Sequence, residues 1–203
     1  MRKLFVVGDS ISIKYGPYLK VMVGARFFYD RKRGEDQALA DLDKAVGSNG
    51  GDSGMVLDYL LSEQKNGVKY DVLLINCGLH DIKTDPLTGQ KQVPTPQYKY
   101  NIENISELVK KIATVPIWVR TTDAIESIHN SRSTISFHRY HEDVEAYNAI
   151  ADEIMAAGGI SILDLYSFTK VFGDEAYIDH VHFNQDVQRM QAAFIAGFLD
   201  NRI

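Results

Sequence analysis

The sequence predicts an α/β domain in which helices cover both faces of a parallel sheet. The candidate strands are short, continuous apolar runs, which is typical of strands buried on both faces. Segments with helical spacing of apolar residues separate these runs, so the strands are joined by crossovers long enough for a parallel sheet. No internal repeat, low-complexity tract or linker divides the chain, and we expect one domain over 1–203.

Five apolar runs are the expected strands, and each ends where polar or flexible residues begin. The first stops at Gly8, and the third, VLLIN, is a strong buried run that stops at Cys77-Gly78. The fifth follows the pair Gly158-Gly159. In chain order, the expected strands are 3–7, 25–29, 72–76, 117–119 and 160–163.

Six segments carry apolar residues at helical spacing. Pro17 falls near the start of the first, where a first helical turn accepts proline. Two polar stretches lie between the helices: one after Asp81 contains three prolines and a glycine, and 122–141 contains histidines. The expected helices are 16–23, 38–46, 55–61, 102–112, 144–154 and 185–199.

The composition excludes several classes of protein. With 203 residues, 45% of them hydrophobic and 24% charged, the chain can bury a sizeable core. A net charge of -5 argues against nucleic acid as a partner, because nucleic-acid binding needs a basic face. The single cysteine, Cys77, excludes an intrachain disulfide. No apolar stretch reaches the length of a membrane span or of a signal peptide, so we expect a cytoplasmic protein.

Polar residues follow several expected strands at the point where each strand ends. Ser10 follows the first strand, 78–81 follow the third, and the region of Thr122 follows the fourth. The glycine-rich loop GSNGGDSG is expected on the same side. Because ligands of open α/β sheets bind beyond the carboxyl ends of the strands, these residues mark the expected site.

A serine, a histidine and an aspartate have the types and spacing of a nucleophilic triad. In Asp179-x-x-His182, the carboxylate can accept a hydrogen bond from the imidazole Nδ1–H and leave Nε2 free to take a proton. Ser10 at the same edge of the sheet can reach that Nε2. Ser10 also has a simpler interpretation as a helix cap, since Asp and Ser are favoured at helix starts.

Three groups are candidate donors to an oxyanion. Gly54 follows a glycine-rich loop, where a backbone N–H can approach a substrate without an obstructing Cβ. Ser10 stands where a helix begins, so its own N–H lacks a helical partner. His80, after the third strand, can offer a ring N–H.

Four blocks of this sequence, in order, resemble those of the SGNH (GDSL) hydrolase family. They are Gly8-Asp9-Ser10, then Asn49 to Gly54, then Gly78-Leu79-His80-Asp81, and finally Asp179-x-x-His182. Each block alone is a permissive pattern, but four in order at strand ends are specific. The match runs from the N-terminus almost to the C-terminus.

The resemblance implies a fold and a set of roles. The fold would be a flavodoxin-like three-layer α/β/α sandwich with a five-stranded parallel sheet. The activity would be ester hydrolysis through an acyl-enzyme, with Ser10 as nucleophile, His182 as general base and Asp179 as its orienting partner. The backbone N–H groups of Ser10 and Gly54 would form two parts of the oxyanion hole.

The chain departs from the family pattern at the third part of that hole. The family's block is Gly-x-Asn-Asp, and its asparagine side chain donates to the oxyanion; here the position is His80. Neutral imidazole has one N–H and can donate in the same direction only as the correct tautomer. We expect His80 to be the third donor.

Other polar residues near these blocks are expected to support the site. Asp9, Asp81 and Asn49 brace the loops on which the motifs lie, and His180 is expected on the rim without a catalytic role. A metal site using His180, His182 and Asp179 is a weaker hypothesis, because it leaves the Gly8-Asp9-Ser10 turn unexplained. We therefore expect no metal or cofactor. In 122–141, the histidines His129, His138 and His141 indicate a solvated loop, with a lid as the alternative.

The sequence thus favours a serine esterase that acts on a short acyl group of a small-molecule or carbohydrate ester. A non-catalytic or acyltransferase relative that binds a glycan or acylated ligand is the alternative, and a metal-dependent hydrolase is the third hypothesis. The sequence leaves the oligomeric state open.

Overall fold

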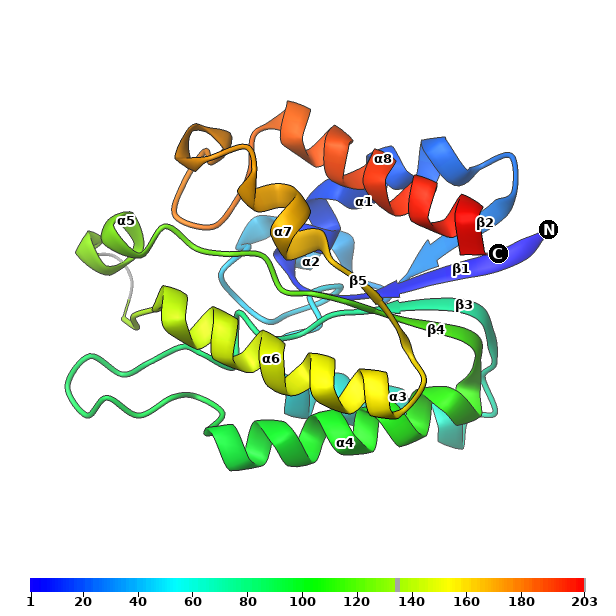
Figure 1. Cartoon of the computed structure of the whole chain (residues 1–203), viewed down its shortest axis with the longest axis horizontal. Coiled ribbons are helices and arrows are strands. Elements are labelled where there is room, and N and C mark those ends of the chain that lie inside the picture. The colour runs from blue at the N-terminus through cyan, green and yellow to red at the C-terminus, as the bar shows by residue number, and fades with distance from the viewer. Residues whose placement is uncertain (134–135, 203) are drawn as a thin grey trace.

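Over residues 1–133 and 136–202, which the computed structural model describes, five parallel strands form one sheet in the order β2-β1-β3-β4-β5 (Figure 1). This is the strand order of flavodoxin-like folds, so the predicted fold class is confirmed. The strands are β1 (Arg2–Val7), β2 (Phe27–Arg31), β3 (Tyr70–Ile75), β4 (Ala113–Val119) and β5 (Ser161–Leu163).

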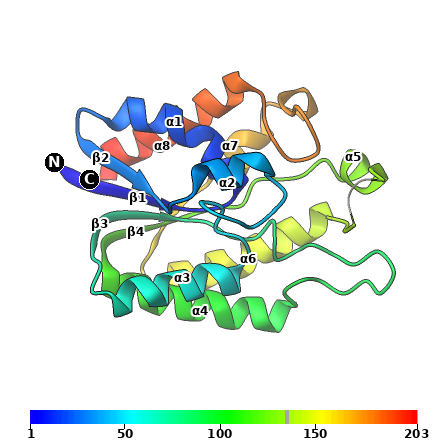
Figure 2. The same ribbon diagram turned by 180° about the vertical axis from the view of Figure 1, so that it is seen from behind.

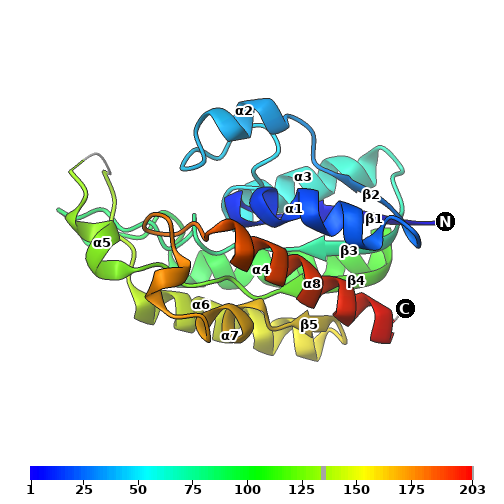
Figure 3. The same cartoon turned by 90° about the horizontal axis from the view of Figure 1, so that it is seen from above.

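Helices cover both faces of the sheet and complete the three layers (Figures 1 and 2). One face carries α3 (Ser53–Lys65), α4 (Thr95–Ile112) and α6 (His141–Ala157). The other carries α1 (Ser10–Val23), α7 (Leu165–Lys170) and α8 (Gln185–Arg202). The short helix α2 (Glu35–Ala40) follows β2 at the edge of the sheet, and α5 (Glu126–Ser131) lies beyond the carboxyl ends of the strands (Figure 3).

The central strand β3 shows why the sequence forms this sheet. It pairs with β1 on one side and β4 on the other, and its residues Val72 to Ile75 are no more than 1% exposed. A strand enclosed in this way needs apolar side chains on both faces. Trp118 on β4 is fully buried and extends the same core.

Helix α1 begins six residues before the position that the sequence indicated. The expected range of 16–23 is wrong at its start, because the Asp9 carboxylate accepts a hydrogen bond from the Ile11 N–H at 3.0 Å and caps a helix that starts at Ser10. Pro17 therefore lies inside the helix rather than in its first turn, on the exposed side. Ser10 becomes the first residue of a long helix that is anchored on β1.

Two further predictions for this region need correction. The helix expected at 38–46 is α2, which ends at Ala40, because Asp41 adopts an extended conformation and then accepts from the Asp43 N–H in a turn. The strand expected at 25–29 lies two residues later. Its last residue, Arg31, is a buried cation that donates to the Ser12 carbonyl and hydroxyl. A strand placed from a run of apolar residues does not include such a charged residue.

The remaining helices are longer than expected, or were not predicted. The segments 55–61, 102–112, 144–154 and 185–199 lie inside α3, α4, α6 and α8. Helix α5 lies within the polar stretch 122–141, of which 134–135 fall outside the described residues, and α7 and the 3₁₀ turn η1 (Asp174–Ala176) were not predicted. Among the helices described, none is long and apolar enough to cross a membrane.

Candidate active site

The turn between β1 and α1 presents Ser10 at the carboxyl edge of the sheet. Asp9 is the N-cap of α1, and its carboxyl group is buried, which raises its pKa. Gly8 accepts a hydrogen bond from the Gly50 N–H at 2.8 Å, and a Cβ on Gly50 would lie 3.2 Å from that carbonyl oxygen. This close contact fixes the glycine-rich loop against the serine turn.

The loop before α8 brings a histidine and an aspartate to the same place. His182 Nε2 lies 2.9 Å from Ser10 Oγ, and His182 Nδ1 lies 2.7 Å from Asp179 Oδ2. Ser10 and His182 are 172 positions apart in the sequence and both are buried. The three side chains thus form one continuous chain of hydrogen bonds, in the order the sequence predicted.

The Asp179 carboxylate is held ionised by the turn in which it lies. Its Oδ1 accepts from the backbone N–H groups of Val181 and His182, both at 2.8 Å. Burial acts to raise the pKa of Asp179, but the hydrogen bond from the His182 ring and these two N–H groups outweigh it and hold the pKa below its ordinary value. Asp179 can therefore stabilise a positive charge on His182 at neutral pH.

The start of α3 places Gly54 close to this edge. Asp52 caps the helix through a 3.0 Å hydrogen bond from the Met55 N–H, so Gly54 falls in the first turn, where backbone N–H groups lack helical acceptors. Asn49 braces the preceding loop: it is fully buried, and its Oδ1 accepts from the Gly51 N–H at 3.0 Å.

His80 and Asp81 lie in the loop after β3. This loop begins with Gly78, which packs closely against Thr121 in the segment after β4. Gly78 has a φ of 153°, and a Cβ there would lie 2.4 Å from Thr121 Oγ1, so this position requires glycine. The His80 ring is 2% exposed, and burial, followed by the nearby charges of Lys83 and Arg139, holds its pKa well below the ordinary value. His80 is therefore a neutral imidazole with one N–H, as the proposed donor role requires.

Comparison with solved structures identifies this arrangement of elements. The chain aligns with the lipase/acylhydrolase from Enterococcus faecalis at 20% identity and a TM-score of 0.74, covering 100% of this chain and 97% of that one. It aligns with a member of the lipolytic protein G-D-S-L family from Veillonella parvula at 17% identity and a TM-score of 0.65, covering 99% of each. The chain has the fold of the SGNH hydrolases. An acetyl xylan esterase also shares it, at 13% identity and a TM-score of 0.70, over 99% of this chain and 100% of the other.

At the level of sequence, no family model and no curated protein matches the chain. The likeness to SGNH structures therefore shows the fold, while the roles of individual residues depend on the geometry described above.

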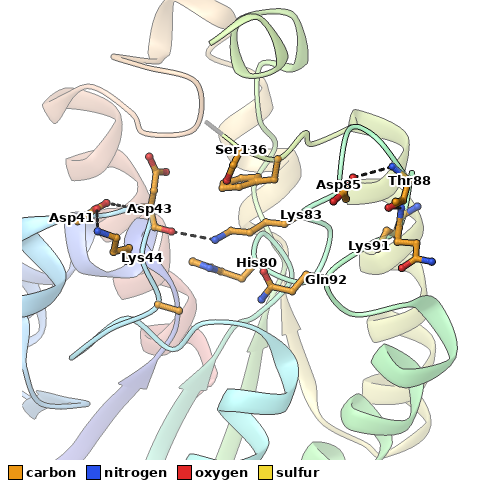
Figure 4. Close-up of a pocket in the computed structure, with 13 residues that line it drawn as sticks. Asp41, Asp43, Lys44, His80, Lys83, Asp85, Thr88, Lys91, Gln92 and Ser136 are labelled. Carbon is orange, nitrogen blue, oxygen red and sulfur yellow. Dashed lines mark hydrogen bonds and ion pairs between the residues drawn. The ribbon is translucent and has the colours of Figure 1, made fainter. Parts of the chain in front are cut away.

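A cavity of about 840 Å³ lies at the same edge of this SGNH fold (Figure 4). His80 is in its wall, together with Lys83, Gln92 and Phe137, and Asp43 and Lys44 lie opposite. Ser10 and His182 do not line this cavity; they are 4% and 3% exposed. His80 is thus the predicted site residue that borders the cavity.

The stretch 122–141 contributes side chains that sequence reasoning missed. Arg139 is 2% exposed and donates from Nε to the Leu79 carbonyl oxygen at 2.7 Å, which fixes the loop that carries His80. Its charge acts on the carboxylates of Asp9 and Asp179, and burial lowers the pKa of Arg139 to about 10. An arginine in a polar stretch has no sequence signal for burial, because the elements that enclose it lie elsewhere in the chain.

Two histidines close to the site are buried. His129 is fully buried, so the prediction that it lies in a solvated loop is wrong. Its ring centroid lies 4.5 Å from that of His180, which is 1% exposed. His180 contacts the Arg132 guanidinium at 2.5 Å and the Asp43 carboxylate at 3.4 Å. These contacts support the turn that carries Asp179 and His182.

The geometry also bears on the metal hypothesis. Both ring nitrogens of His182 are engaged, one with Asp179 and one with Ser10. Within the described part of the chain, no group of three or more histidine, cysteine or acidic side chains is arranged to hold a metal ion.

Asp81 links the loop after β3 to the start of α3 by a hydrogen bond. Its ionisation makes the stability of the folded protein depend on pH. Its Oδ1 accepts from the Ser53 N–H at 2.9 Å, and burial raises its pKa to about 7. Between pH 4 and pH 7 the folded protein therefore holds a proton that the unfolded chain releases, so the free energy of unfolding falls as pH rises through this window.

We expect Asp81→Asn to remove this decline, which is on the order of 2–4 kcal/mol. Urea unfolding of wild type and variant from pH 4 to pH 8 measures the difference between the two slopes. Asp58→Asn, which changes an exposed carboxylate on α3, is the control and keeps the wild-type slope. Equal slopes in wild type and Asp81→Asn would show that Asp81 ionises normally.

Proposed function

We propose that the protein is a serine esterase that hydrolyses a carboxylic ester through an acyl-enzyme. The observation that carries the proposal is the hydrogen-bond chain from Asp179 through His182 to Ser10, with distances of 2.7 Å and 2.9 Å. Asp9 already caps α1, so capping does not account for Ser10, for the buried histidine on its hydroxyl or for the half-buried, ionised carboxylate behind that histidine.

The reaction follows from the roles of these groups. Ser10 Oγ attacks the ester carbonyl carbon as its proton moves to His182 Nε2, and Asp179 stabilises the imidazolium. The bond from carbon to the alcohol oxygen then breaks, and the alcohol leaves with the proton from His182. Water repeats the sequence on the acyl-enzyme and releases the acid and free Ser10. No cofactor takes part in these steps.

The negative oxygen of each tetrahedral intermediate needs donors that are already in place. The backbone N–H groups of Ser10 and Gly54 lie in the first turns of α1 and α3, which are capped by Asp9 and Asp52. His80 is the third donor in this proposal. Its burial and lowered pKa support a fixed, neutral ring at that position.

For the substrate, we infer a short acyl group, and an acetyl group on a carbohydrate is the first candidate. The structures that share the fold include acetyl xylan esterases, one of them from Geobacillus stearothermophilus. The cavity beside His80 is polar, with lysines, glutamine and aspartates in its wall, which suits a hydroxyl-rich alcohol better than an acyl chain.

The proposal is tested with a panel of 4-nitrophenyl esters of increasing acyl length and with a fluorophosphonate probe. We expect the highest kcat/KM for the acetyl ester and one covalent adduct, which peptide mass spectrometry locates on Ser10. A protein that hydrolyses none of the esters and takes up no probe is not a serine esterase, and binding of an acylated glycan would then favour the non-catalytic alternative.

A further inference from the structure

Two cations beside the cavity lie against one aromatic ring. Lys83 Nζ is 4.5 Å and Arg139 Cζ is 4.9 Å from the centroid of the Phe137 ring. Lys83 is half-buried and Arg139 is buried, and burial followed by the charge of Arg139 lowers the pKa of Lys83. Like charges held close together in a poorly solvated place repel each other, and an anion between them relieves that repulsion.

Lys83 has no carboxylate partner in the described part of the chain, unlike the other lysines of the cavity wall. Lys44 pairs with Asp41 at 2.9 Å, and Lys91 pairs with Asp143 at 3.0 Å. Lys83 instead donates one hydrogen bond, to the backbone carbonyl of Asp43 at 3.1 Å, which leaves two ammonium N–H groups for another acceptor.

One more donor near Lys83 is incompletely used. Arg139 donates from Nε to Leu79, but its buried Nη1 has no acceptor among the described residues. Figure 4 shows the Lys83 ammonium beside the His80 ring. The Asp43 carboxylate, which lies near this group, faces His180 Nε2 at 3.4 Å.

We propose that this cavity is a subsite for a carboxylate on the alcohol part of the ester, held by Lys83 with Arg139 behind it. The inference rests on the proposed function, in which His80 borders both the reacting carbonyl and the cavity. The acyl group would stay at Ser10, and the alcohol would extend past His80 toward Lys83. An acetylated acidic sugar has this chemistry.

The test compares two acetylated substrates that differ in one charge. One is methyl glucuronoside with a single acetyl group, and the other is the same acetylated methyl glucoside without the carboxylate. Acetate release gives kcat/KM for each. We expect wild type to prefer the acidic sugar and Lys83→Met to lower that preference about tenfold, the effect of losing one charged hydrogen bond. Lys91→Met, which removes a paired lysine from the same wall, keeps the wild-type preference.

The pH dependence of the preference provides a second readout. Burial and then Arg139 lower the pKa of Lys83 to about 8, against the opposing charges of Asp43, Asp52 and Asp41. The preference should therefore decline as pH rises through 8, because Lys83 loses its charge. A lysine with a purely structural role would not change substrate preference with pH.

Failure of this inference and failure of the proposed function are distinguishable. If the enzyme hydrolyses 4-nitrophenyl acetate but Lys83→Met leaves the preference between the two sugars unchanged, the subsite is wrong and the esterase stands. If no ester is hydrolysed, calorimetric binding of methyl glucuronoside to wild type and Lys83→Met still decides. Tighter binding to wild type supports the subsite, and equal or absent binding overturns it.

Discussion

Replacing Ser10 by alanine is expected to lower kcat/KM for 4-nitrophenyl acetate by about 10⁴- to 10⁶-fold. The variant lacks the oxygen that forms the acyl-enzyme, and neither His182 nor the oxyanion donors can supply another nucleophile in the same place. The fold should remain, because α1 is capped by Asp9 and not by Ser10, and the lost hydroxyl hydrogen-bonds to the side chain of His182. Kinetics together with thermal unfolding measure both effects.

A matched control for this variant lies two residues away. Ser12 is also buried in the first turn of α1, but its hydroxyl donates to the Asp9 carbonyl and accepts from Arg31. Ser12→Ala therefore costs stability and keeps most of the activity. Near-wild-type hydrolysis by Ser10→Ala would contradict the nucleophile assignment, and loss of activity in both variants with a lowered Tm would point to structural damage.

His80→Ala is expected to lower kcat by about 10²- to 10³-fold, the usual cost of removing one oxyanion donor. KM should change little, because the ring N–H matters most when negative charge develops on the carbonyl oxygen. His80→Asn should recover much of the loss, since an amide N–H donates in the same direction. Steady-state kinetics on the three proteins with one short-chain ester test this order.

The choice of control separates donation from packing. His80 is buried, so alanine also leaves a cavity there, and asparagine fills only part of it. Recovery by asparagine therefore indicates donation. His141→Ala changes a histidine of α6 that pairs with Asp123 at 2.5 Å, and it should keep kcat. If His80→Ala retains near-wild-type kcat, the oxyanion is held by the two backbone N–H groups alone.

Local patterns were sufficient to predict most of the sheet and the positions of the candidate site residues. The runs that form β1, β3 and β4 are apolar on both faces, and burial between two helix layers permits little else. Asp179 and His182 are three residues apart, so a single turn brings them together. Ser10, Gly54 and His80 each follow a strand or a glycine-rich loop, whose position a sequence pattern marks.

Local patterns failed where a residue's environment comes from distant segments. Arg31 extends β2 beyond its apolar run because the start of α1 offers it acceptors. His129 and His180 are 51 positions apart in the sequence, yet their rings contact each other in the interior, with centroids 4.5 Å apart.

By itself, the sequence determined the fold class, the order of the elements and the residue types at the strand ends, since these depend on periodicity and on neighbours along the chain. Only the tertiary structure decided that Ser10 Oγ lies 2.9 Å from His182 Nε2 and that His80 is buried and neutral. It also decided that Lys83 and Arg139 both lie against the Phe137 ring, without a carboxylate partner in the described part of the chain. The physical reason is that the burial of a side chain and its electrostatic environment depend on the residues that pack around it. For the site residues, these neighbours are up to 172 positions away in the sequence.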